Sequence, residues 1–510
     1  GSDDNGIKDK LPKDSLAESD GPYISPNTEC AFTYLILVTD GLPQNDTGAN
    51  QRIKELPGVG DCDVYDSADS SDEAENCLPQ LTEYMANNDL APNTSGDQYG
   101  ITYTIGFTTD QQLLSDAADK GKGKYYQAND VQSLVDAFQG AIVGILSQAT
   151  TFTSPAIAVD SFNSTRSRDE VFYAMFKPGE TVDWVGNIKK LKVTQDDDGN
   201  LGVFDANTNT AFDTNTGSLK DTARTFWSVG ADGGDVEKGG VGALLAQRDP
   251  ASRTLYSDTG INDSFETFST ANFDADALGL SDAVFFSKLD ATNESGAFKQ
   301  LNWARGEDAY DRDGDSDTTE AREWIIGDIL HSQPLVLNYG ARGSFTTDNP
   351  DLRLLVGTNS GFVHLFGSGD GEEDWAFFPK KLVEILPKRR KNAMSNNHVY
   401  GMDLTPVTYR YDQNNDGTLD SGAGDKLWAY LGMRRGGHAY YALDLSDPDS
   451  PSLLWRIDKE TPGFGELGQT WSEPVVTTIP GYVDGNGVHK PVLVFAAGYD
   501  TGKDGSGVAT

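Results

Sequence analysis

The sequence has few cysteines, few histidines and no long apolar run, and each shortage excludes a class of protein. Its 510 residues include three cysteines and five histidines, with no Cys-x-x-Cys pair. A structural zinc site, which takes four Cys or His ligands, is therefore not expected. No apolar run approaches the roughly 18 residues that a membrane-spanning helix needs. We expect no transmembrane segment.

Positive charge is also scarce. There are 40 Lys and Arg residues against 79 Asp and Glu residues, which gives a formal net charge of -39. Such an excess of negative charge argues against nucleic acid and anionic membranes as partners. The negative charge instead favours divalent cations as binding partners or a salty medium outside the cell. The length is sufficient for two or more domains.

All three cysteines lie within the first 80 residues. Cys62 and Cys77 close a short acidic loop and are candidates for a disulfide, which leaves Cys30 to pair with something upstream of this sequence. Spacing alone does not settle the pairing. The chain begins and ends within a pattern, so we expect it to be part of a larger protein.

Residues 1–149 have the pattern of an α/β domain. Residues 31–38 are a continuous apolar run that ends in Thr39-Asp40-Gly41, as required of a strand buried on both faces of a parallel sheet. Residues 101–107 form a second such run. Helical periods lie between and after them, with Asp110 and Asp130 as expected N-caps. The alternation predicts a doubly wound α/β layer.

The periodicity changes after residue 150. Short strands are predicted at the start of a β-rich connector that covers residues 150–323. Residues 206–300 within it are polar, with Gly and Asp clusters, and their pattern predicts only a short helix at 243–247. The predicted strands are residues 155–159, 170–176, 184–193 and 201–204.

The sequence repeats itself over residues 324–510. Each copy has an apolar strand, a glycine turn, an aromatic strand and a strand with a tryptophan, as in residues 352–375 and 427–455, and residues 491–500 begin a third copy. One such unit cannot bury both of its faces, so the copies must stack radially. This predicts an all-β propeller that is incomplete at the C-terminus.

A candidate calcium loop interrupts the second copy. Asp412, Asn414 and Asp416 place oxygen atoms at positions 1, 3 and 5, and Gly417 at position 6 permits the sharp turn that a hard cation needs. Position 12 is an alanine, so Asp420 at position 9 is the expected substitute for the usual carboxylate. The alternative is a solvated acidic hairpin tip.

A second candidate loop lies before the repeats. Acidic side chains alternate along it, but Ser316 replaces the glycine that is wanted at position 6. The alternative is a flexible acidic loop. The candidate ligands are Asp311, Asp313, Asp315, Asp317 and Glu320.

Several motifs together resemble the bacterial type IV pilus tip adhesin and biogenesis family (PilY/PilC type). The similar stretches are residues 184–189, 326–334, 356–366 and 436–444. That family has a von Willebrand factor A-like domain followed by a quinoprotein-like propeller, which is the order expected here. Residues 1–149 resemble the second half of such an A domain.

The resemblance implies specific metal ligands. It places Asp40 in a metal-ion-dependent adhesion site for Mg²⁺ or Mn²⁺, completed by an Asp-x-Ser-x-Ser motif upstream. It also implies a nine-residue Ca²⁺ loop whose acidic positions match Asp412, Asp416 and Asp420, with Asn414 in place of an aspartate. Thr418 would contribute its backbone carbonyl.

The resemblance further implies a secreted, non-enzymatic protein at the pilus tip, on the cell surface or associated with the outer membrane. Its partners would be minor pilins and a host or abiotic surface ligand, and its roles fibre assembly, attachment, surface sensing and twitching motility. The alternative is a quinoprotein-like dehydrogenase that binds a quinone in the propeller. Many such enzymes have a vicinal disulfide, but no two cysteines are adjacent here and none follows Cys77.

Overall fold

The computed structural model describes residues 13–18, 21–23, 33–43, 46–67, 74–90, 98–149, 152–159, 167–195, 201–213, 219–395, 398–483, 485, 487 and 489–501. The chain divides into two compact units. The α/β unit comprises residues 1–150 and 213–218, and the β-rich unit comprises residues 151–212 and 219–510. The fold is mixed α and β, with several sheets, none of which closes on itself among the described residues.

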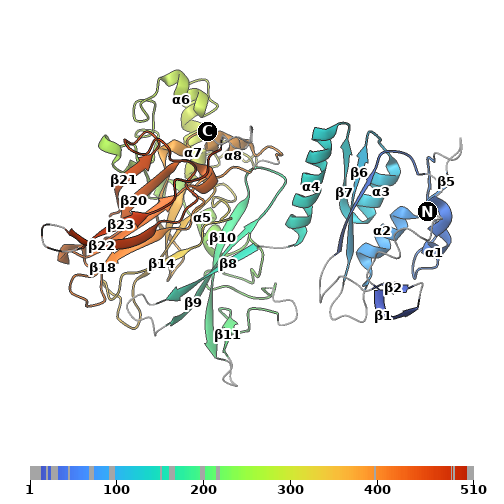
Figure 1. The fold of residues 1–510 in the computed structure, drawn as a ribbon, viewed down its shortest axis with the longest axis horizontal. Coiled ribbons are helices and arrows are strands. Elements are labelled where there is room, and N and C mark those ends of the chain that lie inside the picture. The colour runs from blue at the N-terminus through green and yellow to red at the C-terminus, as the bar shows by residue number, and fades with distance from the viewer. Residues whose placement is uncertain are drawn as a thin grey trace. The chain divides into compact units, whose positions relative to one another are not determined.

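A parallel three-stranded sheet forms the centre of the α/β unit. Its order is β3–β6–β7, and both strand pairs are parallel. Figure 1 shows α4 on one side of this sheet and α2 and α3 on the other. Strand and helix alternate along the chain, as the sequence predicted. The elements are β1 (Lys13–Glu18), β2 (Gly21–Tyr23), β3 (Thr33–Thr39), α1 (Asn50–Lys54), β4 (Val64–Tyr65), β5 (Ala74–Glu75), α2 (Leu78–Asn87), β6 (Gly100–Phe107), α3 (Gln112–Lys120), β7 (Lys122–Ala128) and α4 (Val131–Ala149).

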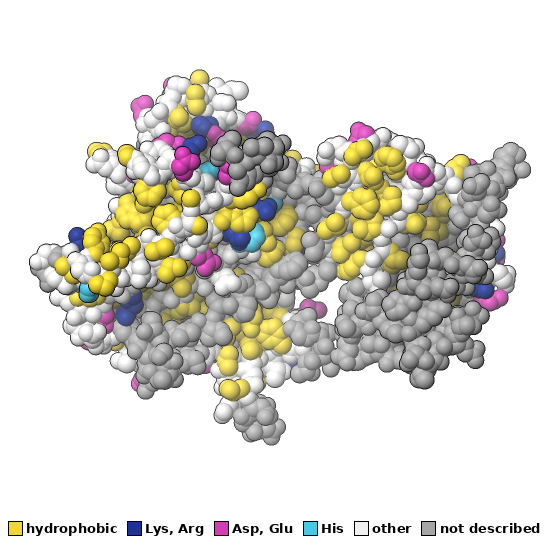
Figure 2. Space-filling model, viewed as in Figure 1, with side chains coloured by type: hydrophobic (Ala, Val, Ile, Leu, Met, Phe, Trp, Pro, Cys, Tyr) yellow, Lys and Arg dark blue, Asp and Glu magenta, His cyan; other side chains and the backbone are white. Residues whose placement is uncertain are grey.

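Only one of the two predicted apolar strands is buried on both faces. β6 lies between two neighbours and is buried along all but its last residue. In β3, by contrast, Leu35, Leu37 and Val38 are 37%, 38% and 40% exposed. The prediction for residues 31–38 is therefore wrong for the described residues, because β3 has a described neighbour along one edge only. Figure 2 shows hydrophobic side chains gathered on the viewed face of this unit.

The two predicted helix caps have different outcomes. Asp130 caps α4, since its Oδ1 accepts a hydrogen bond from the Ser133 backbone N–H at 2.8 Å. Asp110 does not cap α3; its carboxylate accepts a hydrogen bond from the Tyr125 hydroxyl at 3.1 Å, and Gln111 precedes the helix. Neither α4 nor any other helix in the described part of the chain is long and apolar enough to cross a membrane.

The β-rich unit begins with a four-stranded antiparallel sheet. Its order is β11–β10–β9–β8, so each strand pairs with its neighbour in sequence. The four predicted strands of this region are confirmed, and three of them are longer than predicted. They are β8 (Phe152–Val159), β9 (Ser167–Lys177), β10 (Val185–Gln195) and β11 (Leu201–Phe204).

The weakly patterned region after β11 is structured. Three helices and two short strands occur in it, and Phe268, Phe273 and Phe285 are buried in the main core. The sequence predicted only residues 243–247 of the first helix. The elements are α5 (Gly240–Gln247), β12 (Leu255–Ser257), β13 (Glu266–Thr267), α6 (Asp282–Lys288) and α7 (Glu294–Arg305).

The repeated copies form two larger sheets. The first has the order β13–β12–β17–β16–β15–β14, in which β12 pairs in parallel with β17, and the second has the order β18–β19–β20–β21. β22 and β23 form a separate pair. The elements are β14 (Leu335–Asn338), β15 (Leu352–Gly357), β16 (Val363–Gly367), β17 (Glu373–Phe377), α8 (Ile385–Lys391), β18 (Val407–Tyr411), β19 (Lys426–Gly432), β20 (Ala439–Asp444), β21 (Ser452–Asp458), β22 (Val475–Val483) and β23 (His489–Val494).

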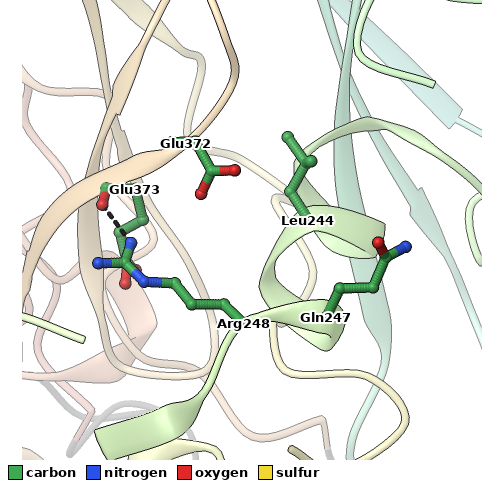
Figure 3. Close-up of a pocket in the computed structure, with 5 residues that line it drawn as sticks. All are labelled: Leu244, Gln247, Arg248, Glu372 and Glu373. Carbon is green, nitrogen blue, oxygen red and sulfur yellow. Dashed lines mark hydrogen bonds between the residues drawn. The ribbon is translucent and has the colours of Figure 1, made fainter. Parts of the chain in front are cut away.

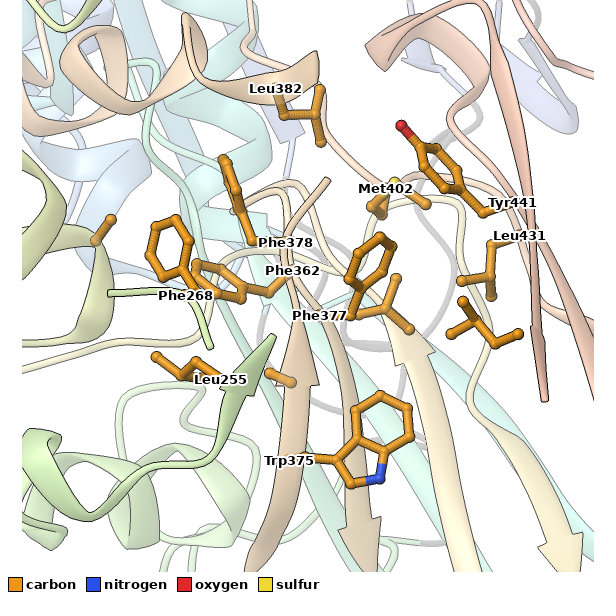
Figure 4. Close-up of a cluster of buried hydrophobic side chains, with 14 of the residues drawn as sticks. Leu255, Phe268, Phe362, Trp375, Phe377, Phe378, Leu382, Met402, Leu431 and Tyr441 are labelled. Atoms are coloured by element: carbon orange, nitrogen blue, oxygen red, sulfur yellow. The ribbon is translucent and has the colours of Figure 1, made fainter. Parts of the chain in front are cut away.

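An aromatic core joins these two sheets. Figure 4 shows Phe362 and Phe377 between Phe268 on one side and Tyr441 on the other. The Phe377 and Tyr441 rings meet edge to face with their centroids 5.6 Å apart. Trp375 on β17 donates its indole N–H to the Pro448 carbonyl, 2.9 Å away, beyond the end of β20. The two sheets are therefore connected by polar contacts as well as by apolar packing.

Candidate metal centres

The loop of residues 412–420 extends from the hairpin of β18 and β19, whose last pair is Tyr411 and Lys426. The Asp412 carboxylate accepts hydrogen bonds from the backbone N–H groups of Asn415 at 2.8 Å and Gly417 at 2.9 Å. Gly417 has a φ of 84°, so glycine is suited to this position. The first six residues therefore curl around the Asp412 side chain, as position 1 of a calcium loop requires.

Two further hydrogen bonds continue this register. The Asn414 side-chain oxygen accepts from the Asp416 N–H at 3.1 Å, and Asp416 Oδ1 accepts from the Thr418 N–H at 2.8 Å. Asp420 differs, because its Oδ1 accepts from the Gly422 N–H at 2.8 Å and so caps a short 3₁₀ turn. The structure thus brings Asp412, Asn414 and Asp416 into one curl, whereas the Asp420 carboxylate caps the turn that follows.

A residue that the sequence reasoning missed supports the loop. Asp425 is 3% exposed, and its two carboxylate oxygens accept from the backbone N–H groups of Gln413 and Asp420, each at 2.8 Å. One buried side chain therefore fixes both ends of the loop. In the sequence, the only feature that could have indicated this role is the position of Asp425 just before β19, opposite the start of the loop.

The same loop contacts the neighbouring sheet. The backbone N–H of Leu419 donates to the Tyr339 carbonyl at 2.9 Å. Gly340 faces Gly417 so closely that a Cβ on Gly340 would lie 2.3 Å from the Gly417 carbonyl oxygen. The loop is therefore packed at its base and exposed at its tip.

The second candidate loop has the same hydrogen-bond register. Asp311 Oδ1 accepts from the Ser316 N–H at 3.0 Å, Asp313 Oδ1 from the Asp315 N–H at 3.3 Å, and Asp315 Oδ1 from the Asp317 N–H at 2.7 Å. Ser316 has a φ of 74° at the position where the first loop has Gly417. The replacement of glycine by serine therefore preserves the turn.

The acidic side chains of this loop form two clusters that share one residue. The oxygen atoms of Asp311, Asp313 and Asp315 lie within 4.8 Å of one another, and so do those of Asp308, Asp313 and Glu320. Asp308 was not among the predicted ligands. Among the described residues, no such cluster of three His, Cys or acidic side chains comes from residues 412–420. That loop relies instead on the amide oxygen of Asn414, and its Asp420 carboxylate is engaged by the Gly422 N–H.

Two acidic side chains of the second loop have shifted pKa values. Desolvation, followed by the negative charges of Asp315 and Asp313, raises the pKa of Glu320. Hydrogen bonds from the backbone N–H and hydroxyl of Thr319 lower the pKa of Asp317. Asp317 therefore folds back onto its own turn and belongs to neither cluster.

The α/β unit contains two sets of candidate residues, Asp40 and the cysteine pair. Asp40 is exposed at the carboxyl end of β3, and it belongs to no cluster of three His, Cys or acidic side chains in the described residues. A cavity of about 720 Å³ lies beside it, lined in part by Thr39, Gly41 and Gln111. Elsewhere in the unit, Cys62 and Cys77 form a disulfide with their Cα atoms 4.9 Å apart. Cys30 lies outside the described residues.

A polar pocket of about 560 Å³ lies between α5 and the start of β17. Figure 3 shows Arg248 pointing toward Glu373, to whose backbone carbonyl it donates a hydrogen bond at 2.5 Å, with Leu244 and Gln247 on the opposite side of the pocket. The Glu373 carboxylate itself turns into the core. Arg248 and Glu373 are thus engaged in structural contacts.

Three histidines of the β-rich unit lie beside acidic side chains. His331 Nδ1 lies 2.6 Å from the Asp403 carboxylate, His398 Nε2 lies 3.1 Å from that of Asp328, and His364 Nδ1 lies 2.7 Å from that of Glu373. Complete burial lowers the pKa of His364, although the charge of Glu373 opposes this shift. The side chains of His331 and His364 are thus hydrogen-bonded to acidic residues within the structure.

Comparison with known proteins identifies relatives of this chain. No family model matches it. It is 28% identical over 384 residues to the type IV pilus biogenesis factor PilY1 of Pseudomonas aeruginosa strain UCBPP-PA14, covering 71% of this chain and 29% of the relative. It is 24% identical over 557 residues to PilY1 of strain PAK, covering 90% of this chain and 43% of the relative. The chain thus spans less than half the length of these relatives.

A solved structure is also similar in sequence. The crystal structure of the Pseudomonas aeruginosa PilY1 C-terminal domain matches 32% of this chain and 29% of that chain, with 25% sequence identity and a TM-score of 0.21. The similarity to PilY1 sequences over most of the chain agrees with the motifs of residues 184–189, 326–334, 356–366 and 436–444. Over most of its length the chain is thus similar to PilY1 proteins, the type IV pilus biogenesis factors.

Proposed function

We propose that this chain is the metal-regulated part of a non-enzymatic type IV pilus factor that acts at the pilus tip. It would take part in fibre assembly, surface attachment and twitching motility. The printed name of its relatives, type IV pilus biogenesis factor, supports the pilus assignment. The excess of 39 negative charges favours a site outside the cell where divalent cations are plentiful.

The observation that carries the proposal is the curled loop of residues 412–420. Calcium would be held by side-chain oxygens of Asp412, Asn414 and Asp416, by the Thr418 carbonyl and by Asp420. All five supply oxygen, the ligand that hard divalent cations prefer. Bound calcium would neutralise three carboxylates on a loop whose ends Asp425 already fixes, so binding would add to the free energy of folding.

We also propose specific folds for the two units. The parallel sheet and its flanking helices support a von Willebrand factor A-like domain, in which Asp40 would be one ligand of an adhesion site for Mg²⁺ or Mn²⁺. The two stacked sheets that follow the repeats support blades of a quinoprotein-like propeller. In this arrangement minor pilins and a surface ligand would be the partners of the whole protein.

Calorimetric titration with Ca²⁺ tests the metal assignment. The chain should bind calcium, and Asp416→Ala should lose the binding at this loop, because it removes a carboxylate from the centre of the curl. Asp276→Ala is the matched control, since it removes one exposed carboxylate outside both acidic loops. Equal titrations for the two variants would refute the site.

A second experiment tests the pilus role. The natural full-length protein that contains this chain is deleted from its own host and restored with or without Asp416→Ala. Deletion should reduce the number of surface pili and the twitching zone, and restoration should recover both. If deletion leaves pili and twitching unchanged, the proposed function is wrong.

A further inference from the structure

One buried carboxylate in the β-rich unit has an oxygen without a partner. Asp308 follows α7 and is 4% exposed. Its Oδ2 accepts a hydrogen bond from the Arg312 backbone N–H at 2.8 Å, whereas its Oδ1 is fully buried and has no hydrogen-bond partner. Burial of an ionised oxygen without a donor or a cation is costly, so such an atom indicates a missing partner.

The Asp308 side chain lies beside two other carboxylates. Oxygen atoms of Asp308, Asp313 and Glu320 lie within 4.8 Å of one another, and Asp313 also belongs to the cluster with Asp311 and Asp315. Three negative groups at this spacing repel one another unless a cation lies among them.

The neighbouring cations are engaged elsewhere. None of the ion pairs formed by described residues includes Asp308, Asp313 or Glu320. The guanidinium of Arg322 donates to the carbonyl groups of Trp324 and Ile325 and lies 4.5 Å from the centre of the Trp303 ring. Arg390 lies over the ring of Tyr310. Among the described residues, no Lys, Arg or His side chain thus forms an ion pair with this cluster.

The backbone holds the cluster in a closed loop. The Asp308 N–H donates to the Glu320 carbonyl at 2.9 Å, and Glu307 pairs with Ala321 as an antiparallel bridge. Between them, Gly314 and Ser316 have positive φ, at 80° and 74°, which turns the loop back on itself. Asp308 and Glu320 are thus fixed at the mouth of the loop, and Asp313 reaches them from within it.

We propose that Asp308, Asp313 and Glu320 bind a calcium ion, with Asp308 as the buried ligand that anchors it. Asp311 and Asp315, which form the other cluster with Asp313, supply further oxygen atoms. The absence of His and Cys from both clusters favours a hard cation, and the uneven spacing of the ligands suits Ca²⁺, which tolerates irregular coordination better than Mg²⁺. This site is independent of the loop of residues 412–420 and stands whether or not that loop binds an ion.

The test uses the whole chain with Asp416→Ala, so that any calcium bound at the first loop is removed. In this parent, Asp308→Asn keeps the shape of the side chain but removes its charge. Asp317→Asn is the control, since Asp317 lies in the same loop, belongs to neither cluster and bonds to Thr319. Calcium is titrated into the three proteins by calorimetry.

We expect Asp308→Asn to weaken calcium binding roughly tenfold or more and Asp317→Asn to change it by less than about threefold. Without calcium, Asp308→Asn should raise the melting temperature, because it removes an unpaired buried charge; with calcium the order should reverse. Equal binding by both variants, or an equal loss in both, would overturn the proposal.

A second variant covers the case in which Asp308→Asn does not fold. Glu320→Gln alters a less buried member of the same cluster and should weaken calcium binding in the same parent. A Glu320→Gln protein that binds calcium as its parent does would also overturn the proposal. Failure of the first loop to bind calcium would show instead as an unchanged titration when Asp416→Ala is introduced into the wild-type chain.

Discussion

The carboxylate of Glu373 receives two parallel hydrogen bonds from the guanidinium of Arg253. Arg253 Nε lies 2.8 Å from Glu373 Oε2, and Nη2 lies 2.9 Å from Oε1, with both side chains completely buried. Burial by itself would raise the pKa of Glu373, but Arg253 and then His364 outweigh it and hold that pKa well below its usual range. The pair connects β17 to the segment before β12.

Removal of one partner from this pair should therefore destabilise the β-rich unit strongly. Glu373→Gln leaves the Arg253 charge buried without a counter-ion, and we expect a loss of about 3–5 kcal/mol in the free energy of unfolding. Glu372→Gln, at the exposed neighbouring position, is the control and should change it by less than about 0.5 kcal/mol. Denaturant unfolding followed by tryptophan fluorescence measures both, since all eight tryptophans lie between residues 184 and 471. Equal stability of the two variants would contradict the role of the pair.

Acid should weaken the β-rich unit through Asp458. Its burial opposes ionisation, but Lys381 and Arg456, each 3.0 Å from its Oδ2, lower its pKa to about 2. Because the pKa is lower in the folded state, this carboxylate stabilises the fold above its ordinary pKa of 3.8, and that contribution is lost as the pH falls from about 4 toward 2.

Asp458→Asn should therefore lower the free energy of unfolding at neutral pH. It should also make that free energy fall less steeply as the pH is lowered over this acid range. Melting temperatures across the range, read by tryptophan fluorescence, measure the slope. A variant with the slope of the wild type would show that Asp458 does not control the acid response.

Asp425 should control the order of the loop of residues 412–420. Asp425→Ala leaves the backbone N–H groups of Gln413 and Asp420 without acceptors, so we expect stability to fall by about 1–3 kcal/mol. If the loop binds calcium, its affinity should fall roughly 10- to 100-fold, as for other supporting residues of metal sites. Asp425→Asn should lose less, since one oxygen acceptor remains. Calorimetry and thermal unfolding together distinguish this result from a local effect of charge, which would weaken both variants alike.

The turn at Ser316 should be stabilised by glycine. A side chain at a φ of 74° is strained by about 1–2 kcal/mol, and glycine removes this strain at a smaller entropic cost. We expect Ser316→Gly to raise stability by up to about 1 kcal/mol, and the reverse change at the equivalent position, Gly417→Ser, to lower it. Thermal unfolding in the absence of calcium measures both, and changes of the same sign would argue against equivalent turns.

The disulfide should stabilise the α/β unit alone. The bond between Cys62 and Cys77 spans 15 residues, and closure of such a loop contributes about 3 kcal/mol. The double variant Cys62→Ala, Cys77→Ala should lower the unfolding transition of this unit, followed by far-ultraviolet circular dichroism. Tryptophan fluorescence, which reports the β-rich unit, should be unchanged. A shift in fluorescence would mean that the two units unfold together.

The repeats and apolar periods predicted much of the fold, because regular elements leave a local pattern. The strands of residues 352–366 and 427–444 occur as expected, with a glycine turn between members of each pair. Residues 206–300 were not predicted, since their buried phenylalanines are separated by Gly and Asp clusters and form no period. The exposure of β3 was also missed, because a sequence run does not state how many neighbours a strand has.

The residues of the candidate sites were likewise predicted where their contacts are local in the sequence and missed where the contacts depend on the fold. Local spacing identified the curl of Asp412 to Asp416, and the hydrogen bonds that form it are equally local. Asp308 and Asp425 were missed, because each acts through a residue that only the folded chain brings beside it. Asp308 in particular lies 12 positions before Glu320, and no loop motif includes it.

The close approach of Gly340 to Gly417 couples the base of the 412–420 loop to the adjoining sheet. The hydroxyl of Tyr339, beside this contact, donates a hydrogen bond to the Leu445 carbonyl at 2.9 Å. Residues 339 and 340 are therefore held by contacts at two places. A loss of order in residues 412–420 would therefore weaken the contact between the two neighbouring sheets. If residues 412–420 bind calcium, calcium should also strengthen the contact between these two sheets.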